Sequence, residues 1–555
     1  MTTNELYTGW KTVPSPETRR MIRDASRQMG DLVRSTLGPW GIDKMIVRRM
    51  SDGELRGFVS NDGSAIMEEF EGETDHPVAQ RFIRAVEDHE DDYGDGSTTM
   101  VLLASELLST AMDLVDRGVH PTDVIEGFSI GGQRTIELWN ETSIPLTDSA
   151  GEFDRTRLRA IVMTGMTNGR NGSWPLGEFA DTVVDGVLRV SDPANGSVRL
   201  DHAKTIAVPG GSVADSTLVE GVVLPENVVT AERLLPATGA VLLVKGSLQS
   251  RSLAADVNVT VESATDAERT SDGLDESEKI AANIGLTDAV AVVATGDVDM
   301  AIAKELARHG VVLLRNVKNT DFEYIARATG ATPRGPVRPD SRIDAVTLGN
   351  ATVRFRDTGR DEDWVAFQPS AGVEAPAVTL VVRGGTRTAA EEAERRIRDG
   401  KNALRACIQT PAALPAGGAA DVAAARAVRS LATRFDGREQ LAAEEFADVL
   451  ESIPKTLAAN AGLNPLDALI ELRVRHDAGH HRAAVSSDGT VVDDVTAEGG
   501  GLDPFQIRVS GLVRAIEFVN SLTRIDGVLL DEREPTVDRV LEEPTYEPGE
   551  KQDSD

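Results

Sequence analysis

Residues 288–317 read DAVAVVATGDVDMAIAKELARHGVVLLRNV, and this stretch decides the class of fold in the centre of the chain. Two β-like runs, AVAVVA and VVLL, flank a segment whose apolar side chains recur at helical spacing. The order strand–helix–strand predicts a βαβ unit, in which the two strands lie parallel to each other. The centre of the chain is therefore expected to be an α/β structure.

Further β-like and helical runs extend this interpretation in both directions. GAVLLVKG at 239–246 and AVTLVVRGG at 377–385 add strands on either side of the βαβ unit. Helical patterns flank this central region, at 17–37, 98–112, 124–139, 389–408, 437–453 and 464–475. A helical body with one short strand at 44–48, interrupted by a large α/β insertion, is the simplest interpretation.

The charge of the chain excludes some classes of function. The chain has 58 Lys and Arg against 90 Asp and Glu, a formal net charge of −32. Such a surface repels nucleic acid and anionic lipid, so neither is an expected partner. Lysine is scarce and arginine carries most of the positive charge, a composition that suits solubility in concentrated salt. We therefore expect a halophilic protein.

Cysteine content and apolar runs indicate the compartment. The single cysteine, Cys407, excludes an internal disulfide and any Cys-rich metal site. The first residues lack the pattern of a signal peptide. Apolar runs such as 240–244 and 311–315 are far shorter than the roughly 20 residues that span a bilayer. These features predict a soluble cytoplasmic protein with no membrane association.

Three elements rich in glycine and aspartate carry candidate chemistry, namely STLGPWGIDKM at 35–45, SNDGSAI at 60–66 and DDYGDGSTTM at 91–100. The third suits a phosphate–metal site. Its glycines allow close approach of the backbone, its hydroxyls and helix-start N–H groups can hold anionic oxygens, and Asp95 can hold Mg²⁺. Taken alone, each such element more often marks ordinary helix initiation than a binding site.

Other motifs give little evidence of a catalytic or metal-binding function. The sequence contains no Walker A pattern, no dinucleotide-binding glycine fingerprint after a strand, no HExxH and no convincing serine-hydrolase elbow. His476 and His480 have the i, i+4 spacing of metal ligands, but their charged and small neighbours favour a solvated turn. From the residues alone, Asp399 is one more charge on a helix surface.

The order of these elements resembles the group II chaperonin family, and within it the archaeal thermosome subunits. TLGPWGIDKM is similar to the family's TLGPKGMDKM, SNDGSAIMEEF to NDGATILKE, and DDYGDGSTT to EVGDGTTT. VVRGGTRTAAEEAER, LPAGGAADV and GLDPFQIR then follow in the family's order. The resemblance extends from about residue 17 to about residue 530 and identifies the chain as a divergent member.

The resemblance implies a multi-domain chaperonin fold. It has a mostly α-helical equatorial domain, a small α/β intermediate domain and an α/β apical domain. The implied boundaries are 1–146 and 403–531 for the equatorial domain, 147–216 and 369–402 for the intermediate domain, 217–368 for the apical domain, and 532–555 for an acidic disordered tail.

The implied function is an ATP-dependent chaperonin subunit that encloses non-native client proteins and assists their folding. It would act in a double ring of identical or related subunits. One alternative stays open, a structural or regulatory ring subunit that binds nucleotide poorly and assembles with active paralogues. A metabolic kinase is a further alternative, for which the sequence indicates no substrate pocket.

Site residues are implied position by position. Nucleotide contacts are expected from Leu37, Gly38, Pro39, Gly63, Gly96, Ser97, Thr98, Thr99, Gly417 and Asp503. Asp95 would ligate Mg²⁺, Asp399 would orient the attacking water, and Asp62 would help to polarise it. Gly417 and Asp503 would face the adenosine end. Because Asp399 lies far along the chain from Asp95, hydrolysis would require a hinge to close over the nucleotide.

The chain departs from the family pattern at several positions. Trp40 stands where the family usually has a basic residue, and Met166 where it has a lysine that senses the γ-phosphate. Ala416 replaces the first glycine of a PGGGA turn. The segment 263–285, where thermosomes carry a lid helix, lacks a large apolar stripe and is expected to be an acidic solvated face. These departures motivate the structural-subunit alternative.

Overall fold

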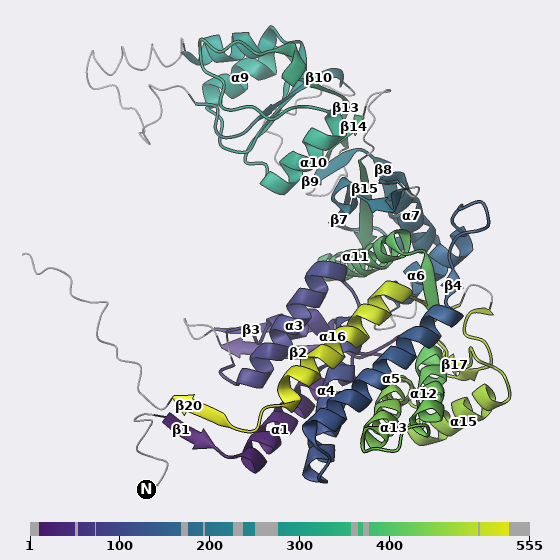
Figure 1. Cartoon of the computed structure of the whole chain (residues 1–555). Helices are drawn as coiled ribbons and strands as arrows, with labels where there is room; N and C mark the ends of the chain where they lie inside the picture. Colours follow the sequence, from purple (N-terminus) through teal and green to yellow (C-terminus); the bar gives the residue numbers. More distant parts are fainter. Residues whose placement is uncertain are drawn as a thin grey trace, which may run out of the picture.

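The chain forms an elongated arrangement of three parts in the computed structural model, with helices at one end, a sheet-containing part at the other, and a smaller part between them (Figure 1). The structure describes residues 10–49, 54–72, 74–167, 176–192, 195–225, 237–249, 276–356, 364–369, 377–497 and 500–531. The acidic tail and residues 263–275 of the predicted lid segment lie outside these ranges, so the expectations for them stay predictions.

The helical part is built from both ends of the chain. Its helices are α1 (Ser15–Arg34), α2 (Gly63–Glu68), α3 (Pro77–Tyr93), α4 (Ser97–Asp116), α5 (Pro121–Thr142), α12 (Ala419–Ala432), α13 (Glu439–Leu450), α14 (Ser452–Asn460), α15 (Pro465–Asp477) and α16 (Phe505–Thr523). The predicted helices at 17–37, 98–112 and 124–139 correspond to α1, α4 and α5. The helix α1 is amphipathic and buries Ile22, Met29 and Val33 against the core.

The helix α4 is the centre of the helical core. Its side chains are apolar on most faces because α1, α16 and α13 all pack around it. By length and composition alone, α4 is the one helix among the described residues that could cross a membrane. Most of it is buried inside the protein, and this core position accounts for its apolar composition.

Short strands connect distant segments of the helical part. The strands β1 (Trp10–Val13) and β20 (Val528–Asp531) pair antiparallel, and so do β2 (Lys44–Arg49) and β3 (Leu55–Ser60). The strand β16 (Ala412–Pro415) lies between β19 (Leu502–Pro504) and β4 (Ile144–Pro145), and β17 (Ala484–Val485) pairs with β18 (Val491–Val492). Segments from both halves of the chain are thereby held at the same place.

The middle part is a small sheet with helices against it. Its sheet has the order β7 (Ala203–Pro209), β15 (Val378–Gly384), β8 (Thr217–Glu220), with β7 parallel and β8 antiparallel to β15. The short strands β5 (Ser191–Asp192) and β6 (Ser197–Val198) pair nearby. The helices α6 (Arg155–Met166), α7 (Leu176–Arg189) and α11 (Arg387–Gln409) pack together and share a core with the sheet. The long helix α11 continues from this part into the helical part, where it contacts α3 and α16.

The distal part contains the predicted βαβ unit. Its sheet has the order β12 (Val312–Leu314), β11 (Ala289–Ala294), β10 (Ala237–Val244), β13 (Gly349–Arg356), β14 (Trp364–Pro369), β9 (Val222–Pro225). The helices α9 (Met300–Arg308) and α10 (Asn319–Thr329) supply buried residues to two separate apolar clusters along the sheet. The strands β11 and β12 flank α9 in sequence and pair parallel, which confirms the interpretation of residues 288–317.

Two expectations from the sequence are wrong in the described residues. The predicted lid segment is not simply a solvated face, because Ile280 and Ile284 near its end are fully buried in the distal core. His476 is also buried, and its Nε2 lies 2.9 Å from the carbonyl oxygen of Ala483. His480 is exposed in the turn region that follows α15, so the prediction of a solvated turn is wrong for His476 only.

Candidate functional site

The helical part contains a cavity of about 500 Å³ lined by residues from both halves of the chain. The walls include most of the predicted site residues, namely Leu37, Gly38, Pro39, Asp62, Asp95, Gly96, Ser97, Thr98, Thr99, Asp399, Gly417 and Asp503. Gly63 lies just behind the wall, where a Cβ atom would come within 2.5 Å of Thr98 Oγ1. A glycine at this position therefore lets α2 approach α4 closely.

The loop between α3 and α4 forms one wall. Gly94 and Gly96 both have left-handed backbone conformations, with φ of +66° and +86°, and they turn the chain sharply around Asp95. The carboxylate of Asp95 accepts a 2.7 Å hydrogen bond from the backbone N–H of Gly96. The side-chain amide of Asn402 on α11 donates to the carbonyl oxygen of Gly94 at 3.0 Å. The loop is thereby fastened to the helix that carries Asp399.

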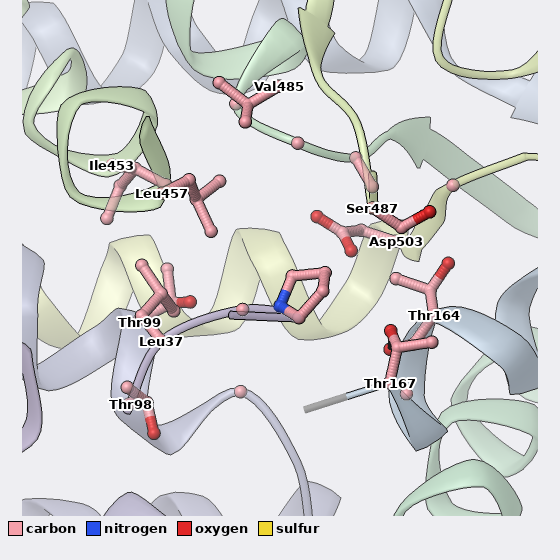
Figure 2. A pocket seen from close by; sticks show the side chains of 18 of the residues that line it. Leu37, Thr98, Thr99, Thr164, Thr167, Ile453, Leu457, Val485, Ser487 and Asp503 are labelled. Atoms are coloured by element: carbon pink, nitrogen blue, oxygen red, sulfur yellow. Dashed lines mark hydrogen bonds between the residues drawn. The ribbon is translucent and has the colours of Figure 1, made fainter. Parts of the chain in front are cut away.

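The start of α4 presents groups that suit an anion. The first N–H groups of a helix have no partner within the helix, and their partial positive charge favours a negatively charged ligand. At α4 these positions are Ser97, Thr98 and Thr99, which add three hydroxyl groups. All three residues line the cavity, and Thr98 and Thr99 are visible on its wall in Figure 2.

Asp62 and Asp399 come to the same cavity from different elements. Asp62 caps the short helix α2, and its two carboxylate oxygens accept hydrogen bonds from the backbone N–H and the hydroxyl of Ser64, at 3.1 Å and 2.8 Å. These bonds fix the orientation of the Asp62 carboxylate. Asp399 projects from α11, and burial raises its pKa well above the usual range, with further repulsion from Asp62 and Asp95.

Acidic side chains far outnumber basic ones on the described wall of the cavity. Among the described residues that line it, the charged side chains are those of Asp62, Glu90, Asp95, Asp399, Asp488, Asp494, Asp503 and Arg508. Burial, with repulsion from Asp503 and Asp62, raises the pKa of Asp95 to about 7, although the Gly96 N–H opposes this shift. Carboxylates held together in this way favour the binding of a cation.

Glu90 is a wall residue that the sequence did not single out. It lies on α3 just before the Asp95 loop, and burial raises its pKa to about 8, with repulsion from Asp62 and Asp95. Nothing in the local pattern marks it, because it belongs to the acidic run EDHEDD, which reads as a solvated face. Only the fold distinguishes Glu90 from its exposed neighbours Asp91 and Asp92.

The carboxylates do not form a closed metal cage. The described residues include no group of three or more Asp, Glu, His or Cys side chains that could hold a metal ion together. Mg²⁺ usually takes only one or two carboxylates and completes its octahedral shell with water and phosphate oxygens. The donor set therefore fits a Mg²⁺ ion that arrives with a phosphate ligand, with Asp95 as the carboxylate beside the phosphate-binding helix start.

The other end of the cavity combines apolar side chains with the carboxylate of Asp503. Figure 2 shows Ile453 and Leu457 on one side and Asp503 further across. Gly417 has a φ of +66°, and a Cβ atom there would lie 2.3 Å from the carbonyl oxygen of Val485. This end can accept a flat apolar group with a hydrogen-bonding substituent, as a nucleoside has.

Two wall residues opposite α4 were also missed by the sequence. Thr164 and Thr167 line the cavity near the end of α6, and both are labelled in Figure 2. The hydroxyl of Thr164 accepts a 3.1 Å hydrogen bond from the backbone N–H of Leu502, which ties α6 to β19. The middle part thus contributes to the cavity through α6 as well as through α11.

The three departures from the family pattern have different surroundings. Trp40 lies at the cavity wall, and its Nε1 donates to the carbonyl oxygen of Ser487 at 3.1 Å. Met166 is fully buried in the core of the middle part, packs against Gly400 and is absent from the described lining. Ala416 lines the cavity and donates its backbone N–H to the carbonyl oxygen of Gly501. No cation therefore occupies the position that the resemblance gives to a lysine.

Comparison with known proteins gives a consistent result. Residues 29–533 match the model of the TCP-1/cpn60 chaperonin family. Thermosome subunit alpha of Halobacterium salinarum is 35% identical over 511 residues, which cover 91% of this chain and 87% of the relative. Thermosome subunit beta of Archaeoglobus fulgidus is 33% identical over 534 residues, or 94% of each chain. Thermosome subunit 1 of Haloferax volcanii is 34% identical over 512 residues, with 91% and 87% covered.

Proposed function

Since the chain belongs to the TCP-1/cpn60 chaperonin family, we propose that it binds ATP with Mg²⁺ in the cavity of the helical part and hydrolyses it there. The resemblance stated from the sequence is confirmed, and the chain is a subunit of a group II chaperonin that assists protein folding. The observation that carries the proposal is the presence of Asp62, Asp95 and Asp399 on the wall of one cavity.

Each wall has a proposed role. The start of α4 binds the phosphates through its N–H groups and the hydroxyls of Ser97, Thr98 and Thr99. Asp95 is the proposed ligand of Mg²⁺, which, when bound, neutralises phosphate charge. Asp399, assisted by Asp62, orients the attacking water. Leu37, Gly38 and Pro39 are further proposed contacts of the nucleotide, and Gly417 and Asp503 would face its adenosine end.

The charge of the wall explains why a metal would be required. The only cationic side chain in the described lining, Arg508, already pairs with Asp421 and approaches Asp503. Without a metal, the polyphosphate would therefore meet carboxylates balanced only by the dipole of α4. Phosphoryl transfer is catalysed mainly by positioning and by compensation of charge, and the proposed arrangement supplies both when the metal is present.

We propose that α11 couples hydrolysis to movement of the subunit. This helix carries Asp399, packs against β7 and β15 of the middle part, and contacts α3 and α16 of the helical part. A rotation of the middle part would move Asp399 relative to Asp95.

The middle part would be the intermediate domain, 147–216 and 369–402, with β8 added because it pairs with β15. The equatorial domain would consist of residues 1–146 and 403–531. The apical domain would consist of residues 217–368.

Assembly into a double ring of identical or related subunits, around non-native client proteins, completes the proposal. One surface that supports it is the exposed face of the β2–β3 hairpin. Met45, Val47, Leu55 and Val59 are 71%, 55%, 65% and 46% exposed, although all are apolar. Met45 and Val59 are direct partners across the hairpin, so the exposed side chains share one face. A neighbouring subunit would cover this face, in a cytoplasmic particle.

A structural or regulatory ring subunit is the second candidate. Met166 favours it, because no positive charge stands at the position where the resemblance expects one. A single lost charge beside a triphosphate removes about 3 kcal/mol of transition-state stabilisation, a loss of about a hundredfold in rate. Such a subunit would assemble and bind nucleotide but turn it over slowly.

Phosphate release by the purified assembly at molar salt decides between the candidates. We expect hydrolysis by the wild type that depends on Mg²⁺ and is lost in Asp95→Asn. Asp297→Asn is the matched control, because Asp297 lies in the distal part and pairs with Arg315 at the surface. Assembled wild-type rings without turnover would instead establish the structural role.

A further inference from the structure

A buried arginine links two walls of the cavity at its proposed nucleoside end. Arg508 on α16 places Nη2 2.5 Å from Oδ1 of Asp421 and Nη1 3.7 Å from Oδ2 of Asp503. Its side chain is only 10% exposed and Asp421 only 1%, whereas Asp503 keeps 24% of its surface. The guanidinium is therefore enclosed, and the Asp503 carboxylate is the member of the group most open to the cavity.

A tryptophan fixes the guanidinium from a third side. The Arg508 guanidinium carbon lies 5.4 Å from the centre of the Trp139 ring, within the range of a cation–π contact. The Nε1 of Trp139 donates to the carbonyl oxygen of Ala420 at 3.0 Å, next to Asp421. Arg508 is thus held by α5, by the first turn of α12 and by β19, and it has little freedom to move.

We propose that Arg508 is a positioning residue for nucleotide binding, which holds the Asp503 carboxylate ready to accept a hydrogen bond from a sugar hydroxyl. This inference rests on the proposed function, because it assumes that the nucleoside occupies this end of the cavity. Arg508 acts through Asp503 and need not touch the nucleotide. Arg508 ends the GLDPFQIR segment, from which only Asp503 was given a role.

The charges explain why the arginine is needed. Asp421 and Asp503 are two carboxylates in a poorly solvated region, and the Arg508 guanidinium lies between them. Without a cation between them, the charge of one carboxylate disfavours ionisation of the other. Asp503 would then lose part of its capacity to accept a hydrogen bond. The 2.5 Å pair with Asp421 occupies one arginine N–H and leaves Asp503 in a looser 3.7 Å contact.

The test compares ATP with 2′,3′-dideoxy-ATP, which lacks both sugar hydroxyls. For the wild-type assembly we expect a KM about tenfold higher for the dideoxy analogue than for ATP. A factor of about ten is the affinity that one hydrogen bond to a charged group contributes. In Arg508→Met we expect the KM for ATP to rise about tenfold, so that the ratio between the two nucleotides falls close to one. The kcat should stay within about twofold, since binding and not the chemical step is affected.

Two further variants separate positioning from a structural role. Asp503→Asn should show the same loss of discrimination, and the double variant with Arg508→Met should lose nothing more, because both act through one carboxylate. Arg508→Lys should recover part of the discrimination, because it keeps the charge without the two-armed geometry. Arg524→Met is the matched control, since Arg524 is an exposed arginine at the end of the same helix.

If Arg508→Met keeps the wild-type ratio of the KM for dideoxy-ATP to the KM for ATP, the inference is overturned, whatever happens to kcat or stability. The proposed function would remain intact. If Arg508→Met fails to assemble, the ratio in Arg508→Lys and Asp503→Asn decides in the same way. Direct calorimetric titration of ATP and the dideoxy analogue replaces KM if the wild type turns over too slowly. A wild type that binds neither nucleotide contradicts both the inference and the proposed function.

Discussion

Asp95 and Asp399 come from opposite halves of the chain and line the same cavity, where the charge of Asp95 adds to burial in raising the pKa of Asp399. Asp399 does not ionise easily while Asp62 and Asp95 are charged and no cation is present. A bound metal removes this conflict, so the cavity is better suited to a metal–nucleotide complex than to an empty state.

The backbone at Gly417 predicts a combined effect on nucleotide binding and stability. In Gly417→Ala the Cβ atom would lie 2.3 Å from the carbonyl oxygen of Val485, at a φ of +66° that alanine adopts poorly. We expect the variant to lose about 1–3 kcal/mol of stability and most of its affinity for ATP. Thermal unfolding and calorimetric titration measure the two effects.

Gly462→Ala is the control for that prediction. Gly462 has a φ of +82°, but a Cβ atom added there would meet no described atom within 4 Å. The control should show the smaller cost of the backbone conformation alone, with unchanged nucleotide affinity. Equal behaviour of the two variants would mean that the contact with Val485 has no role in the cavity.

The buried lysine of α11 predicts a dependence of stability on pH. The ammonium of Lys401 donates to the carbonyl oxygen of Ala203 and, at 3.2 Å, to the hydroxyl of Thr205. Burial, with repulsion from Arg398, lowers the pKa of Lys401 to about 8, below its value of about 10.4 in an unfolded chain. Between these two values the unfolded chain binds more protons, so the free energy of unfolding rises with pH.

Lys401→Met should abolish this contribution. Relative to the variant, the wild type should gain roughly 2 kcal/mol of stability between pH 8 and pH 10, and almost nothing should change between pH 6 and pH 7. Denaturant unfolding at several pH values measures the difference. Lys304→Met on α9 is the control, because Lys304 is exposed. A constant difference across this pH range would contradict the burial of a charged Lys401.

The exposed face of the β2–β3 hairpin predicts a defect of assembly without a defect of folding. Met45 is 71% exposed, so Met45→Asp should leave the isolated subunit folded but place an unpaired charge in a subunit contact. Sizing by light scattering should then show subunits in place of rings. Met300→Asp is the matched control, because Met300 is 60% exposed on the distal part. Intact rings from Met45→Asp would exclude this face from the assembly.

The net charge of −32 predicts that the assembly requires salt. Repulsion between acidic subunits is screened over a few ångströms at molar salt and over about 10 Å at 0.1 M, so rings should dissociate as salt is lowered. Analytical ultracentrifugation across this range measures the change. Rings that persist in dilute buffer would show that the composition is not an adaptation to concentrated salt.

Helices and strands were predictable from the sequence where the spacing of apolar residues over a short stretch determines them. The βαβ unit at 288–317 and the core helix α4 follow from strand and helix periodicity over short stretches. The prediction for His476 was wrong because the exposed neighbours His480 and His481 dominate its local pattern, whereas its burial depends on packing at the end of α15. Burial of Ile280 and Ile284 likewise depends on a sheet formed by distant residues.

Apart from the Asp95 loop, whose glycines and hydroxyls carry a local signal, the site residues were proposed only through the resemblance. No local property of Asp399 distinguishes it from the other charges of α11, and its arrival beside Asp95 depends on the packing of α11 against α3 and α16. Glu90 lies outside the quoted motifs, and Arg508 ends the GLDPFQIR segment without a role assigned to it. Both were missed because each acquires its surroundings from segments far along the chain. Convergence of this kind follows from tertiary structure and has no signature in sequence spacing.

The most direct test of the central claim is the rate of phosphate release from bound ATP in a single turnover by Asp399→Asn at molar salt. If Asp399 orients the attacking water over a site built around Asp95, the rate should fall about a hundredfold or more, while ATP affinity changes less than about threefold. Glu391→Gln, an exposed residue on the same helix, should behave as the wild type. Unchanged hydrolysis by Asp399→Asn would contradict the account.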